Sequence, residues 1–219
     1  MAADNPTHSA PEGATLLRNE PVQARSTARL ASLLDAAAAV VDEIGYERLT
    51  TALVAERAGA SIGTVYRYFP DRIVVLQGLS ARFLRDRIEH TQQTLRDPAR
   101  TSWQDAIDGT FDDLVTAFRT VPGFRSLRFG DVLDLKPDPS SRSGSAMFAG
   151  VVAAALSGRY GLPDDHDLIV RTTVVIDIID ALLSRAFSIN AQEDERYVQE
   201  ARSICHNYLS GFYGDRASA

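Results

Sequence analysis

The stretch of sequence that decides the fold runs from Thr50 to Arg72 and reads TTALVAERAGASIGTVYRYFPDR. It has the pattern of a short helix, a turn that contains glycine, and a second short helix. Gly59 stands where the chain must reverse, at a position that we expect to need a positive φ angle, which glycine adopts at little cost. Ser61 can cap the second helix, because its hydroxyl oxygen accepts a hydrogen bond from a free backbone N–H. The pattern predicts a helix-turn-helix, the unit whose second helix lies in the major groove of DNA.

The apolar residues of this stretch are predicted to form one buried face between the two short helices. They are Leu53, Val54, Ala55 and Ala58 in the first helix, and Ile62, Val65 and Phe69 in the second. Ala55 and Ala58 have small side chains, which allow the two helices to cross at short range. The outer face of the second helix then carries Thr64, Tyr66 and Arg67.

Helical periodicity continues on both sides of this stretch. Apolar residues recur at spacings of three and four from Leu30 to Ile44, and Gly45 follows as a stop signal. Pro70 ends the second short helix, and Asp71 is placed to cap a long helix that reaches about Arg96. Further helices are predicted at 102–120, 123–133, 144–160, 165–188 and 192–213, with a loop at 136–144. The fold class is therefore all-α, with about nine helices.

Composition and periodicity divide the chain into three parts. Residues 1–24 mix Pro, Ala, Ser, Thr, Asn and Gly without apolar periodicity, and we expect a flexible N-terminal tail there. Residues 25–72 are predicted to form a DNA-binding domain around the helix-turn-helix. Residues 73–219 hold the remaining helices, and the 45% hydrophobic content of the chain suffices for a buried core.

The net charge of −6 is unusual for a protein that binds DNA, and its distribution matters more than its sum. Residues 21–72 carry six arginines and six acidic residues, so the acidity lies elsewhere. Within 57–72, Arg57, Arg67 and Arg72 stand against the single acid Asp71. A local basic face can bind phosphate on an acidic protein, although long-range attraction of DNA is then weak.

The string from Ala58 to Arg72, AGASIGTVYRYFPDR, resembles the signature of TetR-family repressors. In that family a small-residue turn leads to a short recognition helix that ends in a Tyr-x-(Tyr/His)-Phe pattern, followed by a capping residue and a basic residue. The strong match covers residues 27–76. The resemblance implies a homodimer that binds a palindromic operator, and it implies that 73–219 form an effector-binding and dimerisation domain. A small-molecule inducer of unknown identity would release the double-stranded DNA.

The resemblance also implies DNA contacts for a set of residues in and around the helix-turn-helix. They are Thr51, Ser61, Gly63, Thr64, Tyr66, Arg67, Tyr68 and Arg72. Tyr66 and Tyr68 present phenol groups to phosphates, which position the protein without reading sequence. Arg67 is the one long cation of the recognition helix, and we expect it to contact a base, most simply guanine. Arg72 opens the next helix, where free amides and the helix dipole already favour phosphate.

The last two predicted helices indicate an interface between two subunits. The predicted helix 165–188 is apolar around most of its circumference. We therefore expect it to be buried both on the side that faces its own subunit and on the side that faces away from it. The predicted interface residues are Val175, Ile179, Leu182, Leu183, Tyr208 and Phe212. A dimer is also what the resemblance implies, because two recognition helices must reach two half-sites. The alternative is that both helices pack only within their own subunit.

An inducer pocket is implied by the resemblance, and the central helices hold aromatic and polarisable side chains of the kind that line such sites. The predicted pocket residues are Trp103, Phe111, Phe118, Phe124, Arg128, Met147, Phe148 and Asp177. The same residue types fill ordinary helical cores. Arg125 or Arg128 suggests an apolar ligand with one anionic end, whereas Asp177 and Asp180 would instead suit a cation.

The sequence contains no motif that is typical of an enzyme, a metal site or a cofactor site. The four histidines have no metal-ligand spacing, and the acids at 164–167 are those expected at a helix start. Cys205 and His206 are sequence neighbours that face different ways on a helix. One cysteine, no membrane-length apolar run and no signal pattern indicate a cytoplasmic protein. The remaining alternatives are a helical adaptor that binds protein, and an activator in place of a repressor.

Overall fold

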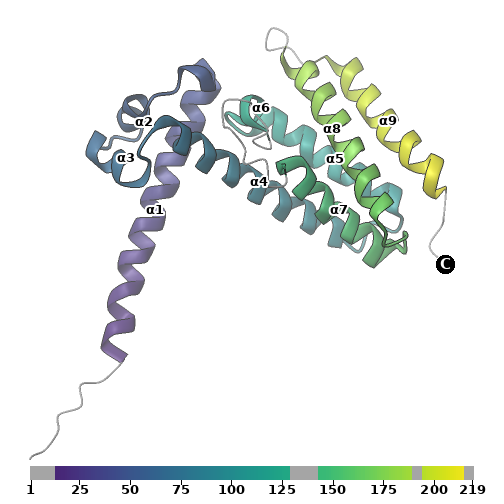
Figure 1. Ribbon diagram of the computed structural model, residues 1–219, viewed down its shortest axis with the longest axis horizontal. Coiled ribbons are helices and arrows are strands. Elements are labelled where there is room, and N and C mark those ends of the chain that lie inside the picture. The colour runs from purple at the N-terminus through teal and green to yellow at the C-terminus, as the bar shows by residue number, and fades with distance from the viewer. Residues whose placement is uncertain (1–12, 129–142, 189–193, 215–219) are drawn as a thin grey trace, which may run out of the picture.

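The computed structural model describes residues 13–128, 143–188 and 194–214, and these parts of the chain are helical without a strand (Figure 1). The elements are α1 (Gly13–Ile44), η1 (Tyr46–Arg48), α2 (Thr51–Arg57), α3 (Ile62–Tyr68), α4 (Arg72–Arg96), α5 (Trp103–Thr120), α6 (Phe124–Leu127), α7 (Gly144–Tyr160), α8 (His166–Ser188) and α9 (Glu195–Tyr213). The all-α prediction is confirmed. None of the described helices is long and apolar enough to cross a membrane.

Helix α1 begins earlier than the sequence pattern predicted. We expected no helix before Arg25, but the helix starts at Gly13 and runs unbroken to Ile44. The segment 13–24 contains Leu, Arg, Glu, Gln and Ala, which have high helix propensity. The sequence pattern therefore missed the helical backbone of 13–24. The flexible tail over 1–24 stays a prediction, and residues 1–12 lie outside the described part of the chain.

The end of α1 and the position of α6 depend on glycines with positive φ. Gly45 has a φ of 82° directly after α1, as the stop signal predicted. Gly123 has a φ of 75°, and a Cβ there would lie 2.9 Å from the carbonyl oxygen of Ala38 in α1. The Gly123 N–H also donates to the Asp42 carboxylate at 2.9 Å. This close approach fixes α6 against α1, and so joins the first helix to the central ones.

Helix α6 is shorter than predicted. The sequence indicated a helix over 123–133, whereas α6 spans Phe124–Leu127 and is followed by Arg128 with a φ of 44°. A positive φ is rare for a side-chain-bearing residue and interrupts helical hydrogen bonding. The rest of that predicted helix, and nearly all of the predicted loop 136–144, lie outside the described residues.

The long helix α4 connects the two ends of the molecule (Figure 1). It packs on α1 near its start and on α5 and α7 farther along, while α8 packs between α7 and α9. One continuous apolar core runs through these contacts. Helix α4 therefore contacts both α1 and the central helices.

Candidate nucleic-acid interface

The turn between α2 and α3 is held by backbone hydrogen bonds that require glycine. Gly59 has a φ of 57°, its N–H donates to the Glu56 carbonyl at 3.1 Å, and the Ala60 N–H donates to the Ala55 carbonyl at 2.9 Å. These two bonds form a Schellman motif, which satisfies the free carbonyls at the end of α2. The positive φ predicted for Gly59 is confirmed.

Side-chain oxygens cap the start of each helix in this unit. The Thr50 hydroxyl accepts from the Leu53 N–H at 3.2 Å, and the Ser61 hydroxyl accepts from the Thr64 N–H at 3.2 Å. The carboxylate of Asp71 accepts from the Val74 N–H at 3.0 Å at the start of α4. The caps predicted at Ser61 and Asp71 are confirmed, and the cap at Thr50 was not predicted although its sequence position favours it.

The buried face of the unit agrees with the sequence pattern except at one residue. Val54 and Val65 are fully buried and Phe69 is nearly so. Ile62 was predicted to lie on this inner face, but its side chain is 43% exposed. Ile62 is the first residue of α3 and therefore lies at the edge of the buried face, where solvent reaches it.

The opposite face of α3 is exposed. Tyr66 is 51% exposed, Arg67 and Gly63 are exposed, and Thr64 is half-buried. The Thr51 hydroxyl donates to the Tyr66 phenol oxygen at 3.5 Å, which places α2 and α3 side chains together at one edge. This face presents hydroxyl groups, a guanidinium and a glycine backbone, which are groups that contact DNA phosphates and base edges.

The other predicted contact residues border the same face. The Tyr68 hydroxyl lies 3.2 Å from the Ser26 hydroxyl of α1, and the Arg67 guanidinium lies 5.4 Å from the centre of the Tyr68 ring. Arg72 donates from Nη1 to the Glu47 carbonyl at 2.7 Å. Because that partner is a neutral carbonyl, the contact does not cancel the positive charge of Arg72.

Arg57 differs from the sequence expectation of a basic face within 57–72. Its guanidinium donates to Glu43 of α1, with Nη1 2.8 Å from Oε1, and the hydrogen bond lowers the pKa of that carboxyl group. The pair links α1 to α2 and cancels the charge of Arg57. Two arginines of α1 that sequence reasoning did not single out, Arg25 and Arg29, lie beside Arg67 instead.

A small apolar cavity lies among α5, α7, α8 and α9, with a volume of about 30 Å³. Its lining residues are Ile107, Thr110, Phe111, Leu114, Phe148, Val152, Thr172, Val175, Ile176, Ile179, Cys205 and Leu209. The hydroxyls of Thr110 and Thr172 donate to carbonyls of their own helices, at 2.9 and 2.7 Å. Burial raises the pKa of Cys205 to about 12, so its thiol stays neutral. The cavity wall therefore offers almost no free polar group.

The structure does not bring the eight predicted pocket residues into one site. Phe111 and Phe148 line the cavity, whereas Trp103, Phe118 and Phe124 are buried in other parts of the core. Phe118 contacts the rings of Phe124 and Phe187, each at 5.3 Å between ring centres. Aromatic composition could not separate these positions, because a core and a cavity wall use the same residues.

The charged residues suggested for the ligand are placed elsewhere. Arg128 pairs with Asp180 at 3.0 Å, and Arg125 donates to the Phe118 carbonyl at 2.6 Å. Met147 is 43% exposed and Asp177 is exposed. None of these charged side chains lines the cavity, so the expected anionic end of a ligand has no cation there.

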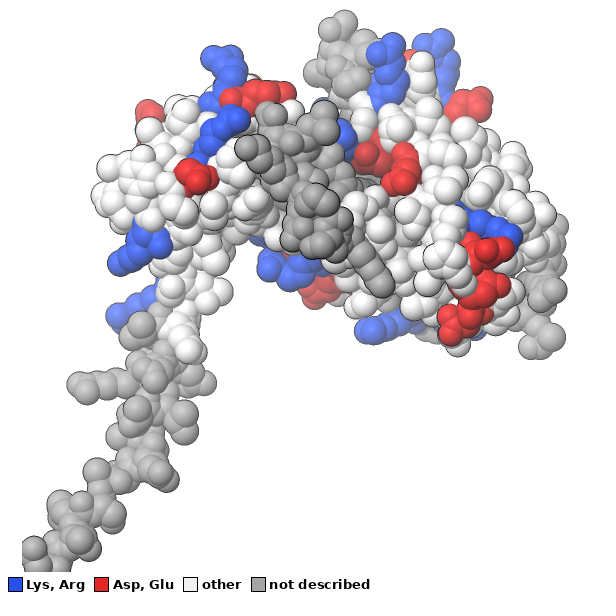
Figure 2. All heavy atoms as spheres, in the orientation of Figure 1, with Lys and Arg blue, Asp and Glu red and all other residues white. Residues whose placement is uncertain are grey.

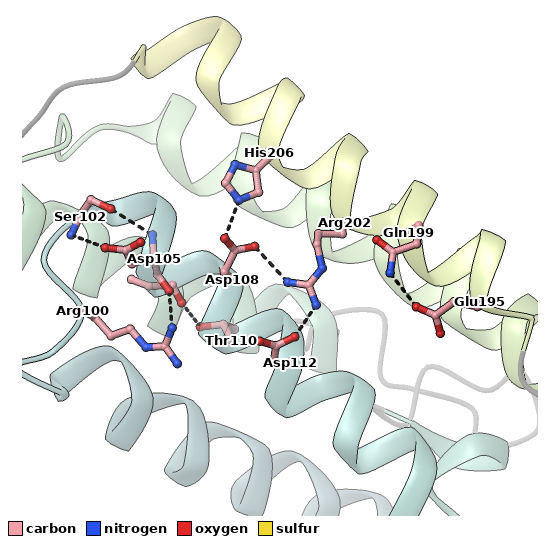
Figure 3. A network of polar contacts seen from close by, with 11 residues as sticks. Arg100, Ser102, Asp105, Asp108, Thr110, Asp112, Glu195, Gln199, Arg202 and His206 are labelled. Atoms are coloured by element: carbon pink, nitrogen blue, oxygen red, sulfur yellow. Dashed lines mark hydrogen bonds and ion pairs between the residues drawn. The ribbon is translucent and has the colours of Figure 1, made fainter.

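A polar network lies over the cavity between α5 and α9 (Figure 3). Asp108 accepts from Arg202 at 3.1 Å and from His206 at 2.9 Å, while the other guanidinium nitrogen of Arg202 contacts Asp112. The Arg202 guanidinium also lies 4.5 Å from the centre of the Phe111 ring, which lines the cavity. Burial alone would lower the pKa of Arg202, but its bonds to Asp112 and Asp108 raise the pKa overall. These ion pairs and hydrogen bonds thus link α5 to α9 next to the cavity.

The predicted dimer residues fall into two groups. Val175, Ile179 and Leu183 are buried within the subunit, where the first two line the cavity. Leu182 and Tyr208 are half-buried, and Phe212 is 53% exposed. The apolar pattern of α8 marked both its inner and its outer side, and the sequence could not tell them apart.

Two family models match this sequence. Residues 33–75 match the model of bacterial regulatory proteins, tetR family, and residues 101–213 match the model of the tetracyclin repressor-like C-terminal domain. A solved TetR-family transcriptional regulator from Streptomyces coelicolor is 32% identical, with a TM-score of 0.71. That match covers 84% of this chain and 98% of the other.

Two curated regulators are similar over shorter segments. The HTH-type transcriptional repressor KstR of Mycobacterium tuberculosis is 33% identical over 85 residues, which are 38% of this chain and 39% of KstR. The HTH-type transcriptional regulator BetI of Burkholderia lata is 34% identical over 88 residues, which are 39% of this chain and 45% of BetI. The matched segment thus spans less than half the length of these curated relatives.

Proposed function

Because this chain belongs to the TetR family of bacterial regulatory proteins, we propose that it is a repressor that binds operator DNA as a homodimer. In this proposal a small molecule that binds among the C-terminal helices releases the DNA. The family and the curated relatives are transcriptional regulators, so the chain is a regulator and not an enzyme, as its sequence predicted. Residues 25–72 would form the DNA-binding domain, and 73–219 the domain for effector binding and dimerisation.

The outward face of α3 is the observation that carries the proposal. Tyr66 is 51% exposed, and the exposed Arg67 follows it on α3, so a phenol group and a guanidinium are both available to DNA. We assign phosphate contacts to Thr51, Tyr66 and Tyr68, and a base contact to Arg67. Short residues at the start of α3, Gly63 and Thr64, leave the backbone close to the groove.

The outer face of α8 and α9 supports the proposed dimer. Ile169 and Val170 are each 44% exposed and Phe212 is 53% exposed, which is a large apolar surface for a single subunit. Figure 1 places α9 at the outside of the molecule next to α8. Pairing this face with its two-fold copy would also set two recognition helices at half-sites about one helical turn of DNA, roughly 34 Å, apart.

The cavity supports an uncharged, apolar inducer. Its volume of about 30 Å³ is far smaller than the sites that hold ordinary small molecules, so a ligand must separate the surrounding helices to enter. Separation of α5 from α9 breaks the Asp108–Arg202–His206 network, and α4, which packs on α5 and α7, would carry the change to the helix-turn-helix. A ligand that binds only this expanded state shifts the population away from the DNA-binding state.

Selection of bound duplexes from a random DNA pool, followed by anisotropy titrations at several salt concentrations, tests the DNA part of the proposal. We expect an inverted repeat to be enriched and the affinity to fall steeply as salt rises. Tyr66→Phe should weaken binding to every duplex alike, whereas Arg67→Ala should relax the preference at particular base pairs by about 1–3 kcal/mol. A wild-type chain that enriches no duplex at low salt would point to a protein-binding adaptor instead.

Thermal-shift measurements with matched probes test the inducer class. Long-chain alcohols should raise the Tm, whereas carboxylates of the same chain length should not, because the cavity holds no cation. Val152→Phe, which fills the cavity, should abolish the shift. An equal shift with the carboxylates would contradict the assignment of an uncharged ligand.

A further inference from the structure

We propose that α1 forms a second DNA-binding surface, in which Arg25 and Arg29 bind phosphates of the duplex beside the groove that α3 enters. The inference rests on the proposed DNA binding and adds to it a part of the molecule outside the helix-turn-helix. Its occupant is the sugar–phosphate backbone, which is bound through charge and not through base sequence.

A broad groove between α1 and α3 carries the inference. It has a volume of about 890 Å³ and is lined by Arg25, Ser26, Ala28, Arg29, Ser32, Arg67 and Tyr68. Arg67 and Tyr68 belong to the face of α3 that we assign to DNA, so the groove continues that face onto α1. A duplex bound at α3 would therefore meet the arginines of α1 as well.

Charge in the groove is of one sign. Three of its described lining residues are arginines, and none of the described ones is acidic. Arg25 and Arg29 are both exposed, stand four residues apart and so share one face of α1. Figure 2 shows basic side chains, with no acidic one between them, where α1 leaves the helix-turn-helix. Like charges four residues apart on a helix repel each other, and an anionic partner would relieve that repulsion.

The contrast with Arg57 identifies which arginines serve the DNA. Glu43 neutralises Arg57 from 2.8 Å, and this removes one of the three cations that the helix-turn-helix segment supplies. No described residue forms an ion pair with Arg25 or Arg29 in the parts of the chain that the structure covers. The pair with Glu43 cancels one positive charge near α3, and Arg25 and Arg29 add two positive charges there.

The position of α1 against α3 is fixed by a direct contact. The hydroxyls of Ser26 and Tyr68 lie 3.2 Å apart, at the point where Arg25 and Arg29 flank the end of α3. From Ser26 the helix continues back to Gly13, a rise of about 20 Å at the usual rise per residue. Figure 1 shows this part of α1 projecting past α3.

The double variant Arg25→Gln/Arg29→Gln tests the inference, with Arg85→Gln/Arg96→Gln as the matched control. The control also removes two exposed arginines, both from the α4 surface outside the groove. Binding of the selected operator is measured at several salt concentrations. We expect the slope of log affinity against log salt to fall by about 0.9 for each lost phosphate contact, or about 1.8 per subunit, with an unchanged preference among duplexes. The control should keep the wild-type slope.

The outcomes separate this inference from the function on which it depends. Wild-type chain that binds no duplex would contradict the proposed function itself. Wild-type binding with the same salt slope in the double variant would overturn only the role of α1. Relaxed preference at particular base pairs would also overturn it, because the arginines would then read bases and not phosphates. Matching Tm values for the variants and the wild type verify that the fold is intact.

Discussion

The helix-turn-helix and the cavity region use similar residues in opposite ways. In α3 an aromatic ring and a guanidinium face outward, and Tyr66 is 51% exposed. Around the cavity the rings of Phe111 and Phe148 are buried, and Arg202 lies against Phe111 with both of its carboxylate partners close by. The exposed groups of α3 can reach a charged macromolecule without any rearrangement of the core. The groups around the cavity are packed within the subunit, so a response there depends on repacking.

Aromatic substitutions in the two regions should therefore act on different quantities. Phe118→Ala removes a fully buried ring that contacts two others, so we expect a loss of about 3–5 kcal/mol in the free energy of unfolding. Tyr66→Ala removes an exposed ring and should leave that free energy nearly unchanged while DNA binding falls. Urea unfolding and anisotropy titrations on both variants measure the two effects. If both variants lost a similar amount of the free energy of unfolding, the two regions would not differ in the way proposed.

Cys205 gives a chemical measure of how closed the cavity region is. Its pKa of about 12 lies well above the ordinary thiol value of 9.0, so at pH 9 about one folded molecule in a thousand carries the thiolate, against about half of the unfolded ones. Between pH 9 and 12 the Cys205 thiol is thus protonated in the folded chain and ionised in the unfolded chain. The stability that comes from burying the neutral thiol is therefore fully present below pH 9 and is lost as the pH rises towards 12.

We expect iodoacetamide at pH 9 to modify the folded chain at least a hundred times more slowly than the urea-unfolded chain, because only the thiolate reacts. The chain has one cysteine, so the rate reports this site alone. A cavity-expanding ligand should raise the folded-state rate. Equal rates in the folded and unfolded chains would show that α5 and α9 already stand apart.

The helix-turn-helix could be predicted from sequence in detail, because hydrogen bonds between residues close in sequence determine its caps and its turn. The cavity region could be predicted only in outline. Ser61, Asp71 and Gly59 act on backbone groups within a few residues, so their spacing alone indicated the caps and the turn. The outward position of Ile62 depends on tertiary packing that the same spacing leaves open. The ranges of α4, α7 and α8 were predicted within a residue, because strong periodicity and clear breakers bound them.

Long-range contacts decide the positions that the sequence left open. Phe111 and Phe118 lie two turns apart on α5, yet only Phe111 reaches the cavity. Val175 points inward and Val170 outward on an α8 that is apolar around most of its circumference. Arg57 pairs with Glu43 across 14 positions of sequence, which no local pattern indicates. Such side chains are assigned only once the helices have been packed.

Two glycines allow the same backbone change to be made in both regions. Gly59 and Gly161 have φ angles of 57° and 69°, and a Cβ at either position meets nothing within 4 Å. Replacement by alanine should therefore cost only the strain of a left-handed backbone, about 1–2 kcal/mol in each case. Thermal unfolding should show equal shifts. Only Gly59→Ala should also weaken DNA binding, because it reorients α3; loss of binding in Gly161→Ala would show that the regions are coupled without a ligand.

The smallest expected effect comes from paired helix caps. The hydroxyl of Ser61 accepts from the Thr64 N–H at 3.2 Å, and that of Ser143 accepts from the Ala146 N–H at 3.1 Å, so Ser→Ala at either position should cost about 1 kcal/mol. The Ser61 hydroxyl also lies 2.9 Å from the Thr64 hydroxyl, on the face assigned to DNA. Ser61→Ala should therefore lower operator affinity beyond what its stability loss explains, whereas Ser143→Ala should not. Anisotropy titrations well below the Tm of both variants separate the two effects, since each variant is then fully folded. Equal affinities would show that the start of α3 serves the fold alone, and would move the DNA contact towards Tyr66 and Arg67 at its other end.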